Sequence, residues 1–253
     1  MINEKTAGII IIGDEILSGK VQDTNTFFLT RELWSRGVTV RRISVIPDIA
    51  EEIAEEVRKF SGEYDFVFTS GGIGPTHDDI TIEGVSLAFG VKPVISDVLK
   101  QTLERRYNNL TPAQLKMAEV PEGAELLDEG GQIFPLIKFR NVFIFPGIPE
   151  LLRKKFHAVE WRFRGPKIFL RKVYFKGWES ALAPYLDEIV ALGGMKVGSY
   201  PVIDNEEYSV MVTLESLDEE ALDAAVRLLL SRVPADKIVR VDGAEFQPKC
   251  DEL

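Results

Sequence analysis

The segment most able to do chemistry is a glycine-rich turn that ends in two adjacent carboxylates. It lies between a strand-like apolar run at 66–69 and a helix-like run at 80–89, and it consists of Gly71, Gly72, Ile73, Gly74, Pro75, Thr76, His77, Asp78 and Asp79. Glycines allow a backbone to approach a ligand closely, and their N–H groups can bind an anion. Carboxylates beside a phosphate site are expected to hold a hard cation or to act as a base. The turn therefore predicts metal-assisted chemistry on a phosphorylated small molecule.

A second acidic pair follows another predicted strand. Asp14 and Glu15 come directly after Gly13, at the carboxyl end of an isoleucine-rich strand at 8–12. In a doubly wound sheet of strand order 2-1-3, the first and third strands are neighbours, and ligands bind where their outgoing loops meet. We therefore expect both acidic pairs to converge on one divalent cation. Helix N-capping is the alternative role of Asp78 and Asp79.

Two further loops could contact the ligand. The segment Pro146-Gly147-Ile148-Pro149-Glu150 leads from a buried strand into a helix, and its free amides would suit an anion. An ordinary strand-to-helix connection explains that segment at least equally well. In the segment 22–25, Asn25 could bind the ligand, although a helix cap is the simpler explanation. His77 could contact a phosphate, and with only two histidines in the chain a histidine-rich zinc site is excluded.

The elements that must position these residues alternate between strand and helix. Strands are predicted at 8–12, 38–45, 66–69 and 141–145, with helices between them. We expect Asp48 to cap the helix that follows the second strand, with Glu51 as its capping-box partner. This alternation predicts an α/β domain at 1–164, a three-layer α/β/α sandwich around a mostly parallel sheet.

The pattern changes after residue 164. Strands are predicted at 168–175, 208–214 and 238–241, helices at 179–192 and 217–233, and a further short strand at 197–200. This order predicts a small α+β domain of ferredoxin-like or KH-like type at 165–253.

Composition narrows the classes of partner. The formal net charge is −10, so the overall field repels nucleic acid and anionic membranes. The single cysteine, Cys250, fits a reducing compartment, and neither a signal peptide nor a membrane span is evident. We expect a cytoplasmic protein. A basic stretch at 153–176, which includes Lys155, is interpreted as a solvated connector; the alternative is an electropositive rim that attracts nucleotide or RNA.

Three ordered motifs resemble the molybdopterin-binding-like (MoaB/Mog-like) family, which includes the N-terminal domain of CinA-type proteins. They are Gly13-Asp14-Glu15-Ile16-Leu17-Ser18-Gly19 continued by Asp23-Thr24-Asn25, the turn from Gly71 to Asp79, and Pro146-Gly147-Ile148-Pro149-Glu150. The segment 140–152, and Gly198-Ser199-Tyr200-Pro201 in the second domain, are similar to the N-terminal region of eukaryotic FAD synthases. The resemblance implies the three-layer sandwich and assigns the metal-associated acidic role to Asp79.

The same resemblance implies a divalent-metal-dependent nucleotide pyrophosphatase. The implied metal is Mg²⁺, Mn²⁺ or Co²⁺, held by Asp79, Asp14 and Glu15, and the substrate is of ADP-ribose or FAD type. The backbone of Gly71–Thr76 and Gly147–Glu150 would hold the diphosphate. Because the chain ends without a deamidase or reductase-like domain, we expect neither of those activities.

Three alternatives stay open at this point. The protein could bind molybdopterin or a nucleotide without hydrolysing it. It could bind RNA through the second domain, which the net negative charge argues against. The second domain could also serve only to form a homo-oligomer.

Overall fold

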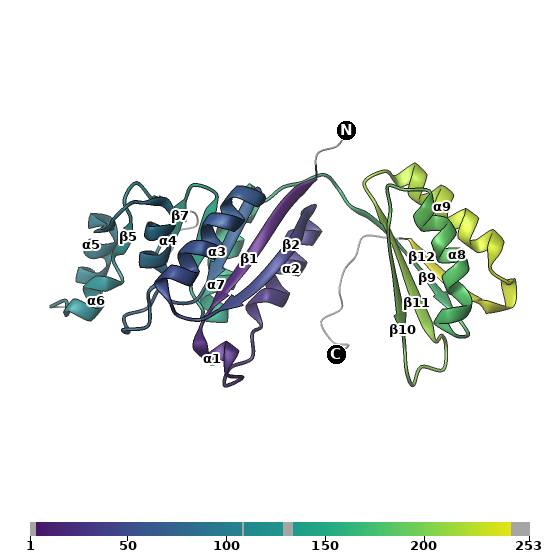
Figure 1. The fold of residues 1–253 in the computed structure, drawn as a ribbon, viewed down its shortest axis with the longest axis horizontal. Coiled ribbons are helices and arrows are strands. Elements are labelled where there is room, and N and C mark those ends of the chain that lie inside the picture. The colour runs from purple at the N-terminus through teal and green to yellow at the C-terminus, as the bar shows by residue number, and fades with distance from the viewer. Residues whose placement is uncertain (1–3, 108, 129–133, 244–253) are drawn as a thin grey trace. The chain divides into compact units, whose positions relative to one another are not determined.

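The structure, a computed structural model, describes residues 4–107, 109–128 and 134–243. The lone cysteine, Cys250, therefore lies outside the described residues. The chain divides into two compact units, and the division falls between Gly165 and Pro166 (Figure 1). Each unit has its own core, and each is described by itself.

The first unit is built on a six-stranded sheet of order β2-β1-β3-β8-β7-β6. Its strands are β1 (Lys5–Ile12), β2 (Val38–Ile46), β3 (Phe66–Ser70), β6 (Glu125–Leu127), β7 (Leu136–Phe139) and β8 (Val142–Phe145). The pairs β2-β1, β1-β3 and β3-β8 are parallel, whereas β8-β7 and β7-β6 are antiparallel. The predicted 2-1-3 order and the mostly parallel sheet are thus confirmed.

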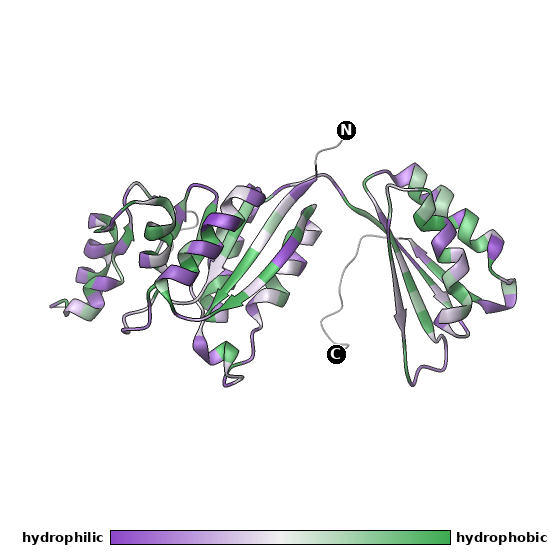
Figure 2. Cartoon of the chain, viewed as in Figure 1, coloured by the Kyte–Doolittle hydropathy of each residue, from purple (hydrophilic) through white to green (hydrophobic). Residues whose placement is uncertain are grey.

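Alternation along β1 explains the three layers. Ile10 and Ile12 pack into one core, while Ala7, Ile9 and Ile11 pack into the other. Successive side chains of a strand point to opposite faces, so the run of four isoleucines that ends β1 must be covered on both faces of the sheet. In Figure 2 the carboxyl-terminal part of β1 is hydrophobic, and hydrophilic residues lie on the outward side of α3. The predicted α/β/α sandwich is confirmed.

The helices divide between the two faces of this sheet. The first unit contains α1 (Asp14–Leu17), α2 (Asn25–Ser35), α3 (Ala50–Glu63), α4 (Thr81–Phe89), α5 (Asp97–Arg106), α6 (Pro112–Lys116) and α7 (Pro149–Val159), followed by a short 3₁₀ turn, η1 (Glu160–Arg162). The core beside Ile10 includes residues of α3, α4 and α5, and the core beside Ile9 includes residues of α2 and α7. A separate two-stranded pair, β4 (Pro93–Ile95) with β5 (Glu119–Pro121), joins the α5–α6 segment to the rest.

One predicted helix cap is wrong. The residue that caps α3 is Ile49, without a side-chain hydrogen bond, and Asp48 does not form the expected box with Glu51. The Asp48 carboxylate instead accepts a hydrogen bond from the backbone N–H of Asp14, at 3.0 Å. Asp48 does not cap α3 because the amide of Asp14, which follows a neighbouring strand and is distant in sequence, donates to its carboxylate instead.

The second unit is a four-stranded antiparallel sheet of order β10-β11-β9-β12. Its elements are β9 (Phe169–Phe175), α8 (Glu179–Ala191), β10 (Lys196–Pro201), β11 (Val210–Ser216), α9 (Glu219–Arg232), the 3₁₀ turn η2 (Ala235–Lys237) and β12 (Ile238–Gly243). Residues of α8 and α9 share one buried core with Val173, Phe175 and Val212 of the sheet. The β-α-β-β-α-β order with this pairing is the ferredoxin-like arrangement.

Within the described residues, every helix is too short or too polar to span a bilayer.

We expect the two units to unfold in separable transitions, because each buries its own apolar residues. Leu214 is fully buried in the second unit, and Leu33 is fully buried in the first. Leu214→Ala should destabilise only the second unit, by about 2–5 kcal/mol. The matched variant Leu33→Ala should act only on the first. Calorimetry of both variants tests this, and a shift of both transitions by either substitution would show that the units unfold together.

Candidate functional site

Two glycine turns meet at the carboxyl ends of β3 and β8. The N–H of Gly71 donates to the carbonyl of Phe145 at 3.2 Å, and a Cβ built on Gly147 would lie 3.4 Å from the Gly71 Cα. Gly71 has a φ of 111°, and a Cβ there would lie 2.0 Å from the carbonyl oxygen of Ile12. Only glycine fits such a position. The two turns that were expected to hold the diphosphate are therefore adjacent in space.

Several amides of these turns have no protein acceptor. Among the described residues, the N–H groups of Gly72, Ile73, Gly74 and Gly147 donate no hydrogen bond. The N–H of Gly71 is used by Phe145, and that of Thr76 donates to Asp79. Fewer amides are therefore available to bind an anion than the sequence implied, because those of Gly71 and Thr76 already donate hydrogen bonds.

Asn25 ties the two turns to α2. Its Nδ2 donates to Ser70 Oγ at 3.0 Å and to the carbonyl of Gly147 at 2.7 Å. The side chain is 6% exposed, and its Oδ1 has no partner among the described residues. The helix cap is supplied by Asp23, whose Oδ1 accepts from the N–H groups of Asn25 and Thr26. Asn25 therefore holds the two turns together, and its Oδ1 is available to accept a further hydrogen bond.

Asp79 closes its own turn. Its Oδ2 accepts from the N–H of Thr76 at 2.8 Å and from the hydroxyl of Thr76 at 2.5 Å. A Cβ on Gly74 would lie 2.6 Å from the same oxygen, so Gly74 lets the carboxylate approach the backbone. Asp79 is thereby held in place at the edge of the glycine turn.

Asp48 is a member of this acidic region that sequence reasoning missed. Burial raises its pKa, and the negative charges of Glu15, Asp14 and Asp78 raise it further, against the hydrogen bond from the Asp14 amide. Asp48 follows β2, which pairs with β1, so its place after a neighbouring parallel strand was the signal that could have found it.

Asp78 and His77 lie further out. The side chain of His77 is 98% exposed, and its Nδ1 lies 3.8 Å from Asp78 Oδ1. A hydrogen bond from the Thr76 side chain is the main cause that lowers the pKa of Asp78. The structure thus places Asp78 near the acidic region in solvent and gives His77 no contact with the cavity described next.

A cavity of about 740 Å³ opens beside the two turns. Its walls include the predicted residues Glu15, Gly71, Gly72, Gly74, Pro75, Asp79, Pro146, Gly147 and Pro149. The predicted residues outside these walls are Gly13, Asp14, Asn25, Thr76, His77, Asp78 and Glu150. An apolar wall comes from α4 to α6, β7 and β8, and it includes Ile82, Leu103, Tyr107, Met117, Phe134 and Ile137. This volume and mixed lining suit an organic ligand that carries anionic groups.

Lys155 also lines this cavity, which corrects its assignment to a solvated connector. The residue is 9% exposed, and its Nζ donates to the carbonyls of Phe134 and Pro135, the latter at 3.1 Å. Burial, and to a smaller extent the neighbouring charge of Lys154, lowers the pKa of Lys155 to about 8. The sequence offered one signal, since Lys155 lies at helical spacing from the apolar residues Leu152 and Val159.

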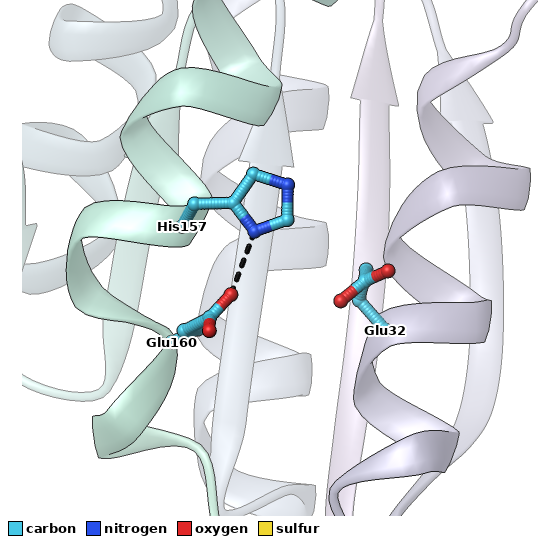
Figure 3. A group of neighbouring side chains, drawn as sticks. All are labelled: Glu32, His157 and Glu160. Atoms are coloured by element: carbon cyan, nitrogen blue, oxygen red, sulfur yellow. Dashed lines mark hydrogen bonds and ion pairs between the residues drawn. The ribbon is translucent and has the colours of Figure 1, made fainter.

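A second cluster lies away from the cavity, between α2 and the end of α7 (Figure 3). Glu32, His157 and Glu160 each offer a ligand atom, and these atoms lie within 4.8 Å of one another, so the group could hold a metal ion. Arg36 already contacts both carboxylates, at 2.6 Å to Glu32 and 2.7 Å to Glu160. His157 Nδ1 lies 2.7 Å from Glu160 Oε2. Figure 3 marks this contact with a dashed line. A cation here would have to displace the guanidinium.

The carboxylates that were expected to share a cation do not form a group as close as the one around His157. Within the described chain, the group around His157 is the one set of three ligand atoms that meets this spacing. Glu15 and Asp79 share the cavity without forming a closed cage with Asp14. A Mg²⁺-type ion is commonly held by one or two carboxylates together with substrate phosphates, so this open arrangement fits such an ion.

Two family models match the chain. The model described as a probable molybdopterin binding domain matches residues 8–162, and the model of the FAD synthase middle domain matches residues 167–242. The first match covers the unit that holds the cavity.

Relatives and a solved structure agree with these matches. A protein of Archaeoglobus fulgidus is 36% identical over 220 residues, which cover 87% of this chain and 94% of that protein. A probable FAD synthase of Caenorhabditis elegans is 32% identical over 259 residues, which cover 90% of this chain but 50% of that protein. The chain thus spans half the length of this relative. The crystal structure of a CinA protein of unknown function from Thermoplasma acidophilum has a TM-score of 0.59 and 32% identity, covering 63% of this chain and 99% of that one.

Removing the Asp48 charge should stabilise the protein at neutral pH. The folded protein raises the pKa of Asp48 above its usual value, so stability falls as the pH rises through that window. We expect Asp48→Asn to unfold at higher temperature than the wild type at pH 7, with the difference vanishing below about pH 4. Added Mg²⁺ should stabilise the wild type more than the variant.

Thermal denaturation across pH measures these effects. The matched control is Glu55→Gln, which removes an exposed carboxylate from α3. It should change neither the thermal stability nor the stabilisation by Mg²⁺. An Asp48→Asn protein that is less stable than the control at pH 7 would contradict the assigned charge repulsion.

Because its amine is buried, Lys155 should make the stability of the protein depend on pH in the alkaline range. The unfolded lysine keeps its proton to about pH 10, whereas the folded one releases it near pH 8. The unfolded state therefore binds more protons in this window, and stability rises with pH. The free energy of unfolding of the wild type, relative to Lys155→Met, should increase by about 1–2 kcal/mol from pH 8 to pH 10. Urea titrations of both proteins across this pH range test the prediction. A difference in the free energy of unfolding that stays constant from pH 8 to pH 10 would show that Lys155 does not titrate in this range.

Proposed function

This chain belongs to the family of probable molybdopterin-binding domains, and from that premise we propose that it hydrolyses nucleotide diphosphates with the help of a divalent metal ion. The proposed substrates are of ADP-ribose or FAD type. One observation carries the proposal: two glycine turns with unused amides and two carboxylates, Glu15 and Asp79, border the same cavity. Such a site accommodates the charge of a diphosphate and the charge of a cation together.

The residues divide into two roles. The amides of Gly72, Ile73, Gly74 and Gly147 bind the diphosphate oxygens, and Asn25 keeps the two turns in register through its bonds to Ser70 and Gly147. The apolar wall beside Tyr107 and Phe134 takes the ring system of the nucleotide. This arrangement orients the diphosphate in a partly dry site, where hydrogen bonds to the developing charge are strongest.

Asp79, Asp14 and Glu15 would hold Mg²⁺, Mn²⁺ or Co²⁺, with Asp48 adjoining them. Burial is the main cause that raises the pKa of Asp48, and the negative charges of Glu15, Asp14 and Asp78 raise it further. The second cause supports this assignment, because a bound cation would offset those charges. When bound, such an ion neutralises charge that develops on the diphosphate. Asp78 lies in solvent next to Asp79 and contributes charge to this region.

The reaction is a hydrolysis. The oxygen of water forms a bond to one phosphorus, the bond from that phosphorus to the bridging oxygen breaks, and two phosphomonoesters leave. Asp79 is the carboxylate placed to orient the water, because its bonds from Thr76 fix it at the edge of the glycine turn.

A binding role without hydrolysis is the second candidate, and a specific observation favours it. Asp79 accepts both of its hydrogen bonds from Thr76, within its own loop. Stabilisation of that loop would be a sufficient role for Asp79 without catalysis. In that case the cavity would hold molybdopterin or a nucleotide, as the family description suggests.

Asp79→Asn separates the two candidates. The asparagine keeps an acceptor for Thr76 but loses the negative charge, so the turn should persist while AMP release from ADP-ribose or FAD falls by about 100-fold or more. Removal of the metal with EDTA should have the same effect on the wild type. Glu55→Gln is the matched control and should retain full activity.

The measurement is product chromatography with Mg²⁺, Mn²⁺ or Co²⁺. A wild-type protein that binds either compound and releases no AMP with any of these metals would favour the non-catalytic role.

A further inference from the structure

Lys155 occupies a position where an apolar side chain would be expected. It lies on the buried face of α7, three residues after Leu152 and four before Val159, which are both inaccessible to solvent. A lysine on such a face normally extends to the surface. Here its amino group ends inside the first unit, at the wall of the cavity.

Among the described residues, the ammonium group has hydrogen-bond acceptors but no carboxylate partner. Its hydrogen bonds go to the backbone carbonyls of Phe134 and Pro135, and it forms no ion pair with any described residue. Burying a charge without an opposite charge is unfavourable, and carbonyl dipoles offset this only in part. The position is therefore unfavourable for stability alone, and its contact with the cavity suggests a ligand that supplies the missing negative charge.

The rest of the wall supports an anionic ligand on this side. Arg106, Lys116 and Lys154 also line the cavity, and Lys116 Nζ donates to the carbonyl of Thr76 at 2.8 Å, next to the glycine turn. In the part of the chain that the structure describes, the carboxylates that line the cavity are Glu15, Asp79, Glu83 and Glu119. Charges of both signs border one volume, as a site for a metal-bound polyanion requires.

We propose that Lys155 binds a non-bridging phosphate oxygen of the ligand, and that it makes the cavity select diphosphates over uncharged compounds with the same ring. This inference rests on the proposed function for the class of ligand, and it adds a residue on α7 that the glycine turns and acidic pairs do not include. The bond is charge-assisted, so its loss affects ligands that carry phosphate and leaves those without phosphate nearly unchanged.

Calorimetric binding of two probes tests the proposal. The first is α,β-methylene-ADP with Mg²⁺, a diphosphate that cannot be cleaved at its bridge, and the second is adenosine. Lys155→Met should weaken binding of the diphosphate by about 10- to 100-fold and that of adenosine by less than about 3-fold. Lys155→Gln, which keeps a donor for the Phe134 carbonyl, should show the same selectivity, and it serves if the methionine variant does not fold.

Arg153→Met is the matched control, because it removes a positive charge from the exposed face of the same helix, outside the cavity. It should leave both affinities unchanged. Equal losses for the two probes in folded Lys155 variants, or no loss for either, would overturn the proposal, and so would a wild type that does not bind the diphosphate probe.

The outcomes also separate this inference from the proposed hydrolysis. A wild type that binds the probe through Lys155 but cleaves neither ADP-ribose nor FAD would disprove the hydrolysis alone. A wild type that cleaves them, with probe binding unaffected in the Lys155 variants, would disprove the role of Lys155 alone.

Discussion

The whole site depends on the absence of a side chain at Gly71. Its Cα passes so close to β1 that a Cβ would lie 2.0 Å from the carbonyl oxygen of Ile12. This contact brings the turn after β3 against the end of β1 and, through Gly147, against the turn after β8. Thr81 then fixes the turn from the other side, since its hydroxyl donates to the Gly71 carbonyl at 2.8 Å. A larger residue at this point would separate the loops that form the cavity.

Two charged groups at or near this cavity, Asp48 and Lys155, lie in positions that lower the stability of the fold. Burial raises the pKa of Asp48 beside the acidic loops and lowers the pKa of Lys155 at the cavity wall, so burial disfavours the charged form of each group. Perturbed pKa values of this kind cluster at functional sites because ligands and cations, when bound, supply the missing opposite charge. By contrast, Glu32 and Glu160 already share an ion-pair partner in Arg36, which joins α2 to the end of α7. We therefore interpret the cavity as the site and that cluster as a structural link.

Local signals in the sequence predicted most elements well. The parallel strands of the first unit and the order of elements in the second follow from residue patterns that are local in the chain. The short strands β4 to β7 escaped prediction because three or four residues carry too little periodicity. Asp48 was misassigned as a cap because its real donor, the Asp14 amide, lies on a different strand end.

The sequence by itself determined the class of fold, the 2-1-3 order of the first strands and the three loops that border the cavity, because periodicity and glycine chemistry are local properties. Only the tertiary structure decided which atoms of those loops remain available. It showed that Asp79 is tied to Thr76, that His77 lies in solvent, and that Lys155 is buried at the cavity wall. The physical reason is competition: a hydrogen-bond donor or a charge chooses among partners that packing brings near, and most of those partners are distant in sequence.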